Sequence, residues 1–173
     1  APKRAVMMAD MYTLDHRPWA ACPRDFLKRQ ISHASDLGLT IQAAFEPEWS
    51  LARQENDGFA PIDDSLCFSG VGMMEPMDVI DDIVGALSVE GLQMDLYHTE
   101  LGHGQQELTI RHADALRAAD NHIVYRETVR NVARQHGLYA SFAPKPFPEQ
   151  AANGCHLHIS SWDTGRERNL FYD

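Results

Sequence analysis

Two pairs of glutamates in this sequence have the spacing of a cation site. Glu46 and Glu48 are two positions apart in a segment rich in Ile, Phe and Trp, and residues two apart on a strand point to the same face. Glu100 and Glu107 flank a glycine-containing segment, so a hairpin would bring these two carboxylates together. Like charges held together repel unless a cation, a proton or a basic group separates them. Either pair alone is more typical of exposed charges on an edge strand or around a tight turn.

A histidine pair lies further along the chain. His156 and His158 are spaced for one face of a strand, whereas Cys155 would point to the other face, which argues against a Cys/His zinc site. A lone His-x-His is more often packed or exposed than ligating, yet neutral imidazole also serves Mg²⁺ or Mn²⁺ beside carboxylates. Taken together, the four carboxylates and two imidazoles indicate a candidate divalent-metal site, and two neighbouring cations suit phosphoryl chemistry. The sequence contains neither of the glycine-rich motifs that hold nucleotide phosphates.

The elements that must position these residues follow from hydrophobic periodicity and from Gly and Pro breakers. Helices are predicted at residues 23–37, 76–89 and 113–136, and strands at residues 5–11, 39–49, 92–100, 105–110, 139–142 and 156–161. The first helix is expected to be amphipathic, with apolar residues at Phe26, Leu27, Ile31, Ala34 and Leu37. The long helix is expected to carry Leu116, Ala119, Ile123, Val132 and Ala133 roughly on one face. Residues 53–74 are predicted to be a loop with short extended pieces. Helices and strands alternate without Rossmann-like regularity, which favours an α+β fold.

Composition narrows the class of protein. The chain has 173 residues, which is the size of one domain. Its apolar fraction of 44% and charged fraction of 23% are globular values. With 25 acidic against 15 basic residues, its formal charge is −10, which disfavours a nucleic-acid partner. It has no apolar run long enough to span a membrane. Three scattered cysteines give no disulfide framework and favour a cytoplasmic location.

The order of the motifs resembles the catalytic domain of the glutamine synthetase family. Glu46-Pro-Glu-Trp49 resembles the family's Glu-x-Glu-Phe strand, and residues 100–107 (ELGHGQQE) resemble its Glu-x-x-x-Gly-Gln-x-Glu turn. Residues 140–146 (ASFAPKP) resemble its Thr-Phe-Met-Pro-Lys-Pro loop. Residues 153–160 (NGCHLHIS) resemble its Gly-Ser-Gly-x-His-x-His-x-Ser strand. The likeness runs in order over nearly the whole chain, including the first and the long helix.

The resemblance implies an α+β fold in which a curved antiparallel sheet packs against helices. It also implies an ATP-dependent ligase that joins the γ-carboxylate of glutamate to ammonia through γ-glutamyl phosphate, as in glutamine biosynthesis. Two Mg²⁺ or Mn²⁺ ions and ATP are expected. The residues carried over by motif are, for the first ion, Glu48, Glu100 and Glu107; for the second ion, Glu46 and His156; for the nucleotide, Asp95, His158 and Ser160; and for the amino acid, Glu48, Glu100, Ala152 and His156.

Two departures from the family pattern shape these expectations. Ala151-Ala152 stands where the family has Asn-Gly touching the amino acid, so a γ-glutamyl-amine or polyamine ligase acting on a primary amine remains an alternative. A catalytically silent relative with an assembly or sensing role is a second alternative. Residues 1–173 are expected to be part of a longer protein, without its N-terminal β-rich domain and its C-terminal part, where the family's third ligand of the second ion and its catalytic arginines lie. The chain alone is therefore expected to be inactive, and the complete protein to be a ring-shaped homo-oligomer.

Overall fold

The computed structural model describes residues 5–172, which divide into two compact units. Unit 1 contains residues 5–44, 112–124 and 159–172, and unit 2 contains residues 45–111 and 125–158. Unit 2 holds the glutamate and histidine pairs, so its internal arrangement is what positions the candidate site. No helix among the described residues is long and apolar enough to cross a membrane.

The three predicted helices are present. They are α1 (Pro23–Asp36), α3 (Met77–Val89) and α4 (Ala115–Gln135), and a short additional helix, α2 (Gly70–Met74), lies within the predicted loop. Helix α1 begins at a proline, whose fixed φ suits the first helical turn. The side chain of Ser69 caps α2 by accepting hydrogen bonds from two backbone N–H groups.

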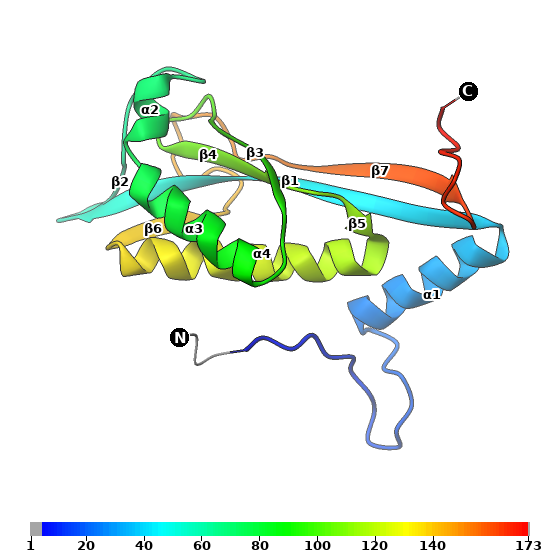
Figure 1. Ribbon diagram of the computed structural model, residues 1–173. Coiled ribbons are helices and arrows are strands. Elements are labelled where there is room, and N and C mark those ends of the chain that lie inside the picture. Colours follow the sequence, from blue (N-terminus) through cyan, green and yellow to red (C-terminus); the bar gives the residue numbers. More distant parts are fainter. Residues whose placement is uncertain (1–4, 173) are drawn as a thin grey trace. The chain divides into compact units, whose positions relative to one another are not determined.

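Antiparallel strands account for the sheet (Figure 1). They are β1 (Leu39–Glu55), β2 (Gly58–Pro61), β3 (Met94–Thr99), β4 (Gln105–Ile110), β5 (Ala113–Asp114), β6 (Leu138–Ser141) and β7 (Cys155–Asp163). Among the described residues β1 pairs with every other strand except β3, which pairs with β4. The mixture of helices and an open antiparallel sheet confirms the predicted α+β class.

The strand register in unit 2 separates two faces of the sheet. Glu48 lies opposite Glu107, and Trp49 lies opposite Gln106. Because side chains alternate along a strand, the glutamates share one face and Trp49 occupies the other. On the Trp49 face, Trp49 Nε1 donates to Tyr125 Oη of α4 at 3.0 Å, and both side chains are fully buried.

Helix α3 packs beside the second half of α4, as Figure 1 shows. Thr128 of α4 donates to Glu90 at the C-terminal end of α3, at 2.9 Å. Apolar side chains of α3 (Val79, Ile80, Ile83 and Leu87) and of β1 and β4 (Leu51, Leu108 and Ile110) are buried. The helices of unit 2 therefore pack against the Trp49 face of the sheet, and the polar residues lie on the opposite face.

Two sequence predictions about local structure are wrong. Residues 5–11 form no strand, because no neighbouring strand pairs with their backbone, and Val6 and Met7 are exposed. The predicted amphipathic helix is present as α1, although none of its side chains is buried in this chain. On α4, Val132 and Ala133 are buried as part of the expected face, but Ile123 is 49% exposed. The other buried residues of that helix are Ala118, Asn121, Tyr125, Thr128 and Val129. A tyrosine with a partner for its hydroxyl can be fully buried, which a purely apolar pattern does not detect.

Candidate functional site

A cluster of two carboxylates and one imidazole lies where β3 and β4 meet. His98 of β3 lies opposite Glu107 of β4 in the strand register, and Glu100 follows two positions after His98. His98 Nε2 is 3.4 Å from Glu107 Oε1, and His98 Nδ1 is 3.5 Å from Glu100 Oε1. One ligand atom from each residue lies within 4.8 Å of the others. The predicted hairpin thus brings Glu100 and Glu107 to one place.

The turn between β3 and β4 depends on a glycine. Glu100 N donates to Gln105 O at 2.9 Å and Gln105 N donates to Gly102 O at 3.0 Å, which closes the turn. Gly104 has φ of +64°, and a Cβ at this position would lie 2.6 Å from Leu51 O. Only glycine adopts this backbone conformation at so close an approach without strain.

The charge of Glu107 is poorly accommodated by the protein alone. Burial raises the pKa of Glu107; His98 opposes the shift, and the nearby carboxylates Glu46, Glu100 and Glu48 add to it. No lysine or arginine within residues 5–172 forms an ion pair with any of these four glutamates. Carboxylates gathered around a buried carboxylate favour either a proton or a cation.

A second cluster joins β1 to β7. Glu46 Oε2 accepts a hydrogen bond from His158 Nε2 at 2.8 Å and lies 3.5 Å from His156 Nδ1. Hydrogen bonding from His158 is the main reason that the pKa of Glu46 is lowered, although burial opposes the shift. The predicted second-ion pair, Glu46 and His156, is therefore together. His158, predicted to line the nucleotide site, is the closer of the two imidazoles to Glu46.

Glu48 lies on β1 between these clusters. Its Oε2 accepts hydrogen bonds from Gln105 Nε2 at 2.5 Å and from Gly154 N at 2.9 Å. A Cβ at Gly154 would lie 2.6 Å from Glu48 Oε1, so the backbone of the loop before β7 approaches the carboxylate more closely than another residue would permit. The structure thus places all four predicted glutamates and both predicted histidines in unit 2.

The other predicted site residues lie in different surroundings. Asp95 Oδ1 pairs with the Arg111 guanidinium at 3.3 Å and is half exposed. Ser160 lies in the part of β7 that belongs to unit 1, where its Oγ accepts from Trp162 Nε1 at 2.9 Å. Ala152 O accepts a hydrogen bond from Gln105 Nε2 at 3.1 Å. The structure brings Ala152 to the Glu48 carboxylate through Gln105, and it leaves Asp95 paired with an arginine.

His98 is the member of the site that the sequence analysis missed. It lies two positions before Glu100 in a segment predicted to be a strand, so the same alternation that paired Glu46 with Glu48 would have placed it beside Glu100. The ring of Phe68 stacks edge-on against the His98 ring, with centroids 5.1 Å apart, which restricts the orientation of the imidazole.

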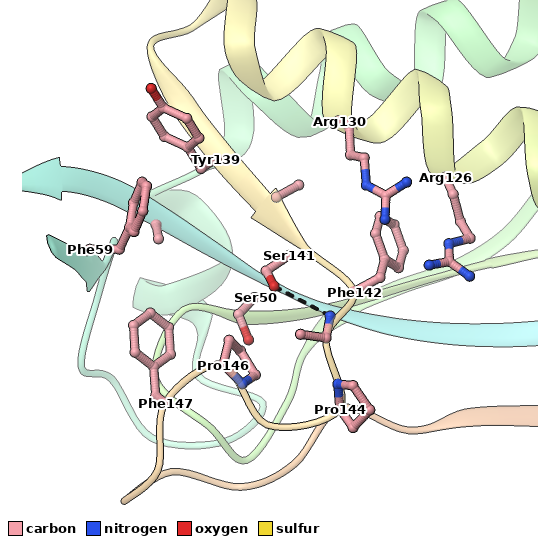
Figure 2. A pocket seen from close by; sticks show the side chains of 13 residues that line it. Ser50, Phe59, Arg126, Arg130, Tyr139, Ser141, Phe142, Pro144, Pro146 and Phe147 are labelled. Atoms are coloured by element: carbon pink, nitrogen blue, oxygen red, sulfur yellow. Dashed lines mark hydrogen bonds between the residues drawn. The ribbon is translucent and has the colours of Figure 1, made fainter.

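A cavity of about 640 Å³ lies beside β6 in unit 2 and contains none of the predicted site residues (Figure 2). The guanidinium groups of Arg126 and Arg130 lie 5.1 and 5.2 Å from the centre of the Phe142 ring. Residues 140–144 and 146 of the predicted Pro-Lys-Pro loop form one wall together with Phe147. Asn153 holds this wall against β1, because its Nδ2 donates to Ala143 O at 2.9 Å and its Oδ1 accepts from Ser50 Oγ at 3.2 Å.

The donor set fits divalent cations that prefer oxygen. Four carboxylates and three imidazoles suit Mg²⁺ or Mn²⁺ better than a thiolate-seeking metal. The burial of Glu107 among other carboxylates, without a lysine or arginine to neutralise it, is an independent structural reason to expect a cation there.

This chain is similar in sequence to members of one protein family. A family model described as the catalytic domain of glutamine synthetase matches residues 20–173. The glutamine synthetase of Thermus thermophilus is 36% identical over 99% of this chain and 40% of its own length. The type-1 glutamine synthetase 1 of Dictyostelium discoideum is 31% identical over 99% of this chain and 38% of its own length. The gamma-glutamylpolyamine synthetase of Streptomyces coelicolor is 33% identical over 90% of this chain and 34% of its own length.

Solved structures show the same fold. A crystal structure of a novel glutamine synthase homolog matches with a TM-score of 0.85 and 35% identity, over 94% of this chain and 37% of that one. A GmaS complex with ADP matches with a TM-score of 0.84 and 32% identity, over 91% of this chain and 37% of that one. This chain therefore spans 34% to 40% of the length of the relatives described here.

Proposed function

Because this chain belongs to the glutamine synthetase family, we propose that it forms the cation-binding part of an ATP-dependent carbon–nitrogen ligase. The observation that carries the proposal is the convergence of Glu46, Glu48, Glu100 and Glu107 on the sheet face opposite Trp49, with the imidazoles of His98 and His158 beside them. Carboxylates held around a buried carboxylate repel one another, and a bound cation would relieve that repulsion.

In the proposed site Glu48, Glu100 and Glu107 hold a first Mg²⁺ or Mn²⁺ ion, and Glu46 and His156 contribute to a second. These ions would supply positive charge between the phosphates of ATP and the carboxylate that accepts a phosphoryl group. His98, within 3.5 Å of both Glu100 and Glu107, orients the two carboxylates.

We assign ATP and glutamate as substrates. The proposed nucleotide contacts in unit 2 are His158 and Asp95. The proposed amino-acid contacts are the Ala152 backbone, Glu48, Glu100 and His156. The proposal that ATP is a substrate is supported by a similar structure, the GmaS complex with ADP. The protein would work as a ring-shaped homo-oligomer in the cytoplasm, where ATP and reduced thiols are available.

The proposed nitrogen substrate is ammonia, with a primary amine as the second candidate. The second candidate rests on two observations: Ala151-Ala152 stands where the family has Asn-Gly, and a relative at 33% identity is a gamma-glutamylpolyamine synthetase. If the Ala152 backbone still contacts the amino acid, glutamate stays the carboxylate substrate while the nucleophile differs.

The test is ATP-dependent phosphate release by the protein that carries residues 1–173 with its flanking regions, assayed with glutamate and either ammonia or a panel of amines. We expect release with one nucleophile class and its loss in His156→Ala. Residues 1–173 alone should show no turnover, because phosphoryl transfer needs both ions and the cationic groups together. Absence of release with glutamate under every nucleophile would refute the ligase and favour a catalytically silent relative.

A further inference from the structure

Gln105 connects three separate segments around the candidate site. Its side chain is 2% exposed. Its Oε1 accepts a hydrogen bond from Gly102 N in the β3–β4 turn at 2.7 Å. Its Nε2 donates to Glu48 Oε2 on β1 at 2.5 Å and to Ala152 O in the loop before β7 at 3.1 Å.

These partners determine which way the amide points. Both Nε2 hydrogens meet acceptors and Oε1 meets a donor, so a flipped amide would place an oxygen against a carboxylate and a carbonyl. A buried amide satisfied in only one orientation is fixed in place, because each lost hydrogen bond leaves an unpaired polar group.

The arrangement also determines which oxygen of Glu48 is left for a ligand. Oε2 accepts from both Gln105 and Gly154, and Gly154 O in turn accepts from Glu48 N at 3.0 Å. Oε1 has no hydrogen-bond donor within residues 5–172. Gln105 and the loop backbone thus hold one carboxylate oxygen and present the other.

We propose that Gln105 is a positioning residue that couples cation binding at Glu48 to the order of the loop at residues 151–154. A cation drawn to Glu48 Oε1 favours the carboxylate orientation that Gln105 holds, and that orientation fixes the Ala152 carbonyl through the same amide. Coupling between two sites is reciprocal, so the ordered loop also favours the cation. The inference rests on the proposed function in one respect, namely that Glu48 binds a cation.

Two variants of neighbouring glutamines test the proposal. Gln105→Met keeps the side-chain length and removes the amide from the site. Gln106→Met is the matched control, because Gln106 is fully buried on the opposite face of the sheet, where its Oε1 accepts from Tyr97 Oη at 2.6 Å. Both variants lose a buried amide, so a general loss of packing affects both.

The measurements are the Mg²⁺ affinity from thermal shift and the hydrogen exchange of the segment 150–155, with and without Mg²⁺ at a concentration that saturates each variant. We expect Mg²⁺ to slow exchange of this segment in the wild type and in Gln106→Met. Gln105→Met should bind Mg²⁺ about 10- to 100-fold more weakly, as is typical when a group that orients a metal ligand is removed. Saturating Mg²⁺ should then leave the exchange of its loop unchanged.

The outcomes separate this inference from the proposed function. If Gln105→Met binds Mg²⁺ as tightly as the wild type and its loop is protected equally, the coupling is wrong while the cation site stands. If Mg²⁺ neither stabilises the wild type nor slows its exchange, the cation site fails and the coupling fails with it. Should Gln105→Met not fold, Gln105→Glu keeps the acceptor for Gly102 N and removes both donors. Protection of its loop by Mg²⁺ equal to that of the wild type would overturn the proposal.

Discussion

Replacing Glu107 by glutamine should separate the charge of this residue from its packing. Glu107 is 7% exposed and faces Glu46, Glu48 and Glu100. Burial raises the pKa of Glu107 above its ordinary value of 4.5, so without a cation the free energy of unfolding falls as the pH rises from 4.5 through the higher folded value. Above the folded pKa of Glu107 this penalty is fully present. Glu107→Gln should therefore melt at the same temperature as the metal-free wild type or at a higher one.

With a bound cation, the wild type should instead melt at a higher temperature than Glu107→Gln. At a Mn²⁺ concentration of about 100 times Kd, binding to the folded state alone adds about 2.7 kcal/mol. For a chain of this size each kcal/mol moves Tm by about 2–4 °C, so the wild type should gain about 5–11 °C. If the variant binds roughly 100-fold more weakly, the same Mn²⁺ concentration equals its Kd and adds about 0.4 kcal/mol. Its Tm should then rise by only about 1–2 °C.

The assay is thermal unfolding after chelator treatment, with and without Mn²⁺, of the wild type, Glu107→Gln and Glu127→Gln. Glu127 is the matched control, because its side chain is 54% exposed and pairs with Arg130 on α4. The control should keep the full rise. If Mn²⁺ raises the Tm of Glu107→Gln as much as that of the wild type, Glu107 does not bind the cation, and the cation does not offset its charge.

Three further predictions concern pH, a buried hydrogen bond and a turn. Because His158 lowers the pKa of Glu46, the stability contributed by this pair is present above pH 4.5 and lost as the pH falls through the lower folded value. In urea unfolding from about pH 6 to about pH 3, the free energy of unfolding should therefore fall less in Glu46→Gln than in the wild type. Tyr125→Phe leaves the buried Trp49 N–H without its partner and should reduce the free energy of unfolding by about 1–3 kcal/mol, seen as a lower urea midpoint at an unchanged slope. Gly104→Ala places a Cβ 2.6 Å from a carbonyl oxygen at φ of +64° and should destabilise by more than about 1 kcal/mol; an unchanged midpoint would show that the turn relaxes.

Local chemistry in the sequence was enough to predict most elements. Proline at the start of α1, glycines at the β3–β4 turn and alternating residues along β4 act over a few positions, so their effect can be read without knowing what else is nearby. The predicted strand 105–110 has the same bounds as β4, and α3 differs from its prediction by one residue at its start. The same alternation correctly placed Glu46 with Glu48, and His156 with His158, on shared faces.

The sequence could not show which element packs against which. Tyr125 of α4 is buried because Trp49, 76 positions earlier, supplies its hydrogen-bond donor, so the buried face of the helix depends on a distant residue. Residues 5–10 have strand-like composition but remain irregular, because a strand requires a neighbour with which to pair.

The site itself was decided by strand register. Sequence spacing put the carboxylates in pairs, but only the pairing of β1, β4 and β3 sets Glu48, Glu107 and His98 side by side. A slip of one residue between these strands would move every side chain of the slipped strand to the other face. The sequence by itself therefore determined which residue types were available and which neighbours shared a face. The tertiary structure decided that His98 joins the glutamates and that Gln105 joins Glu48 to the loop, because hydrogen bonds between distant strands, and not local spacing, set that register.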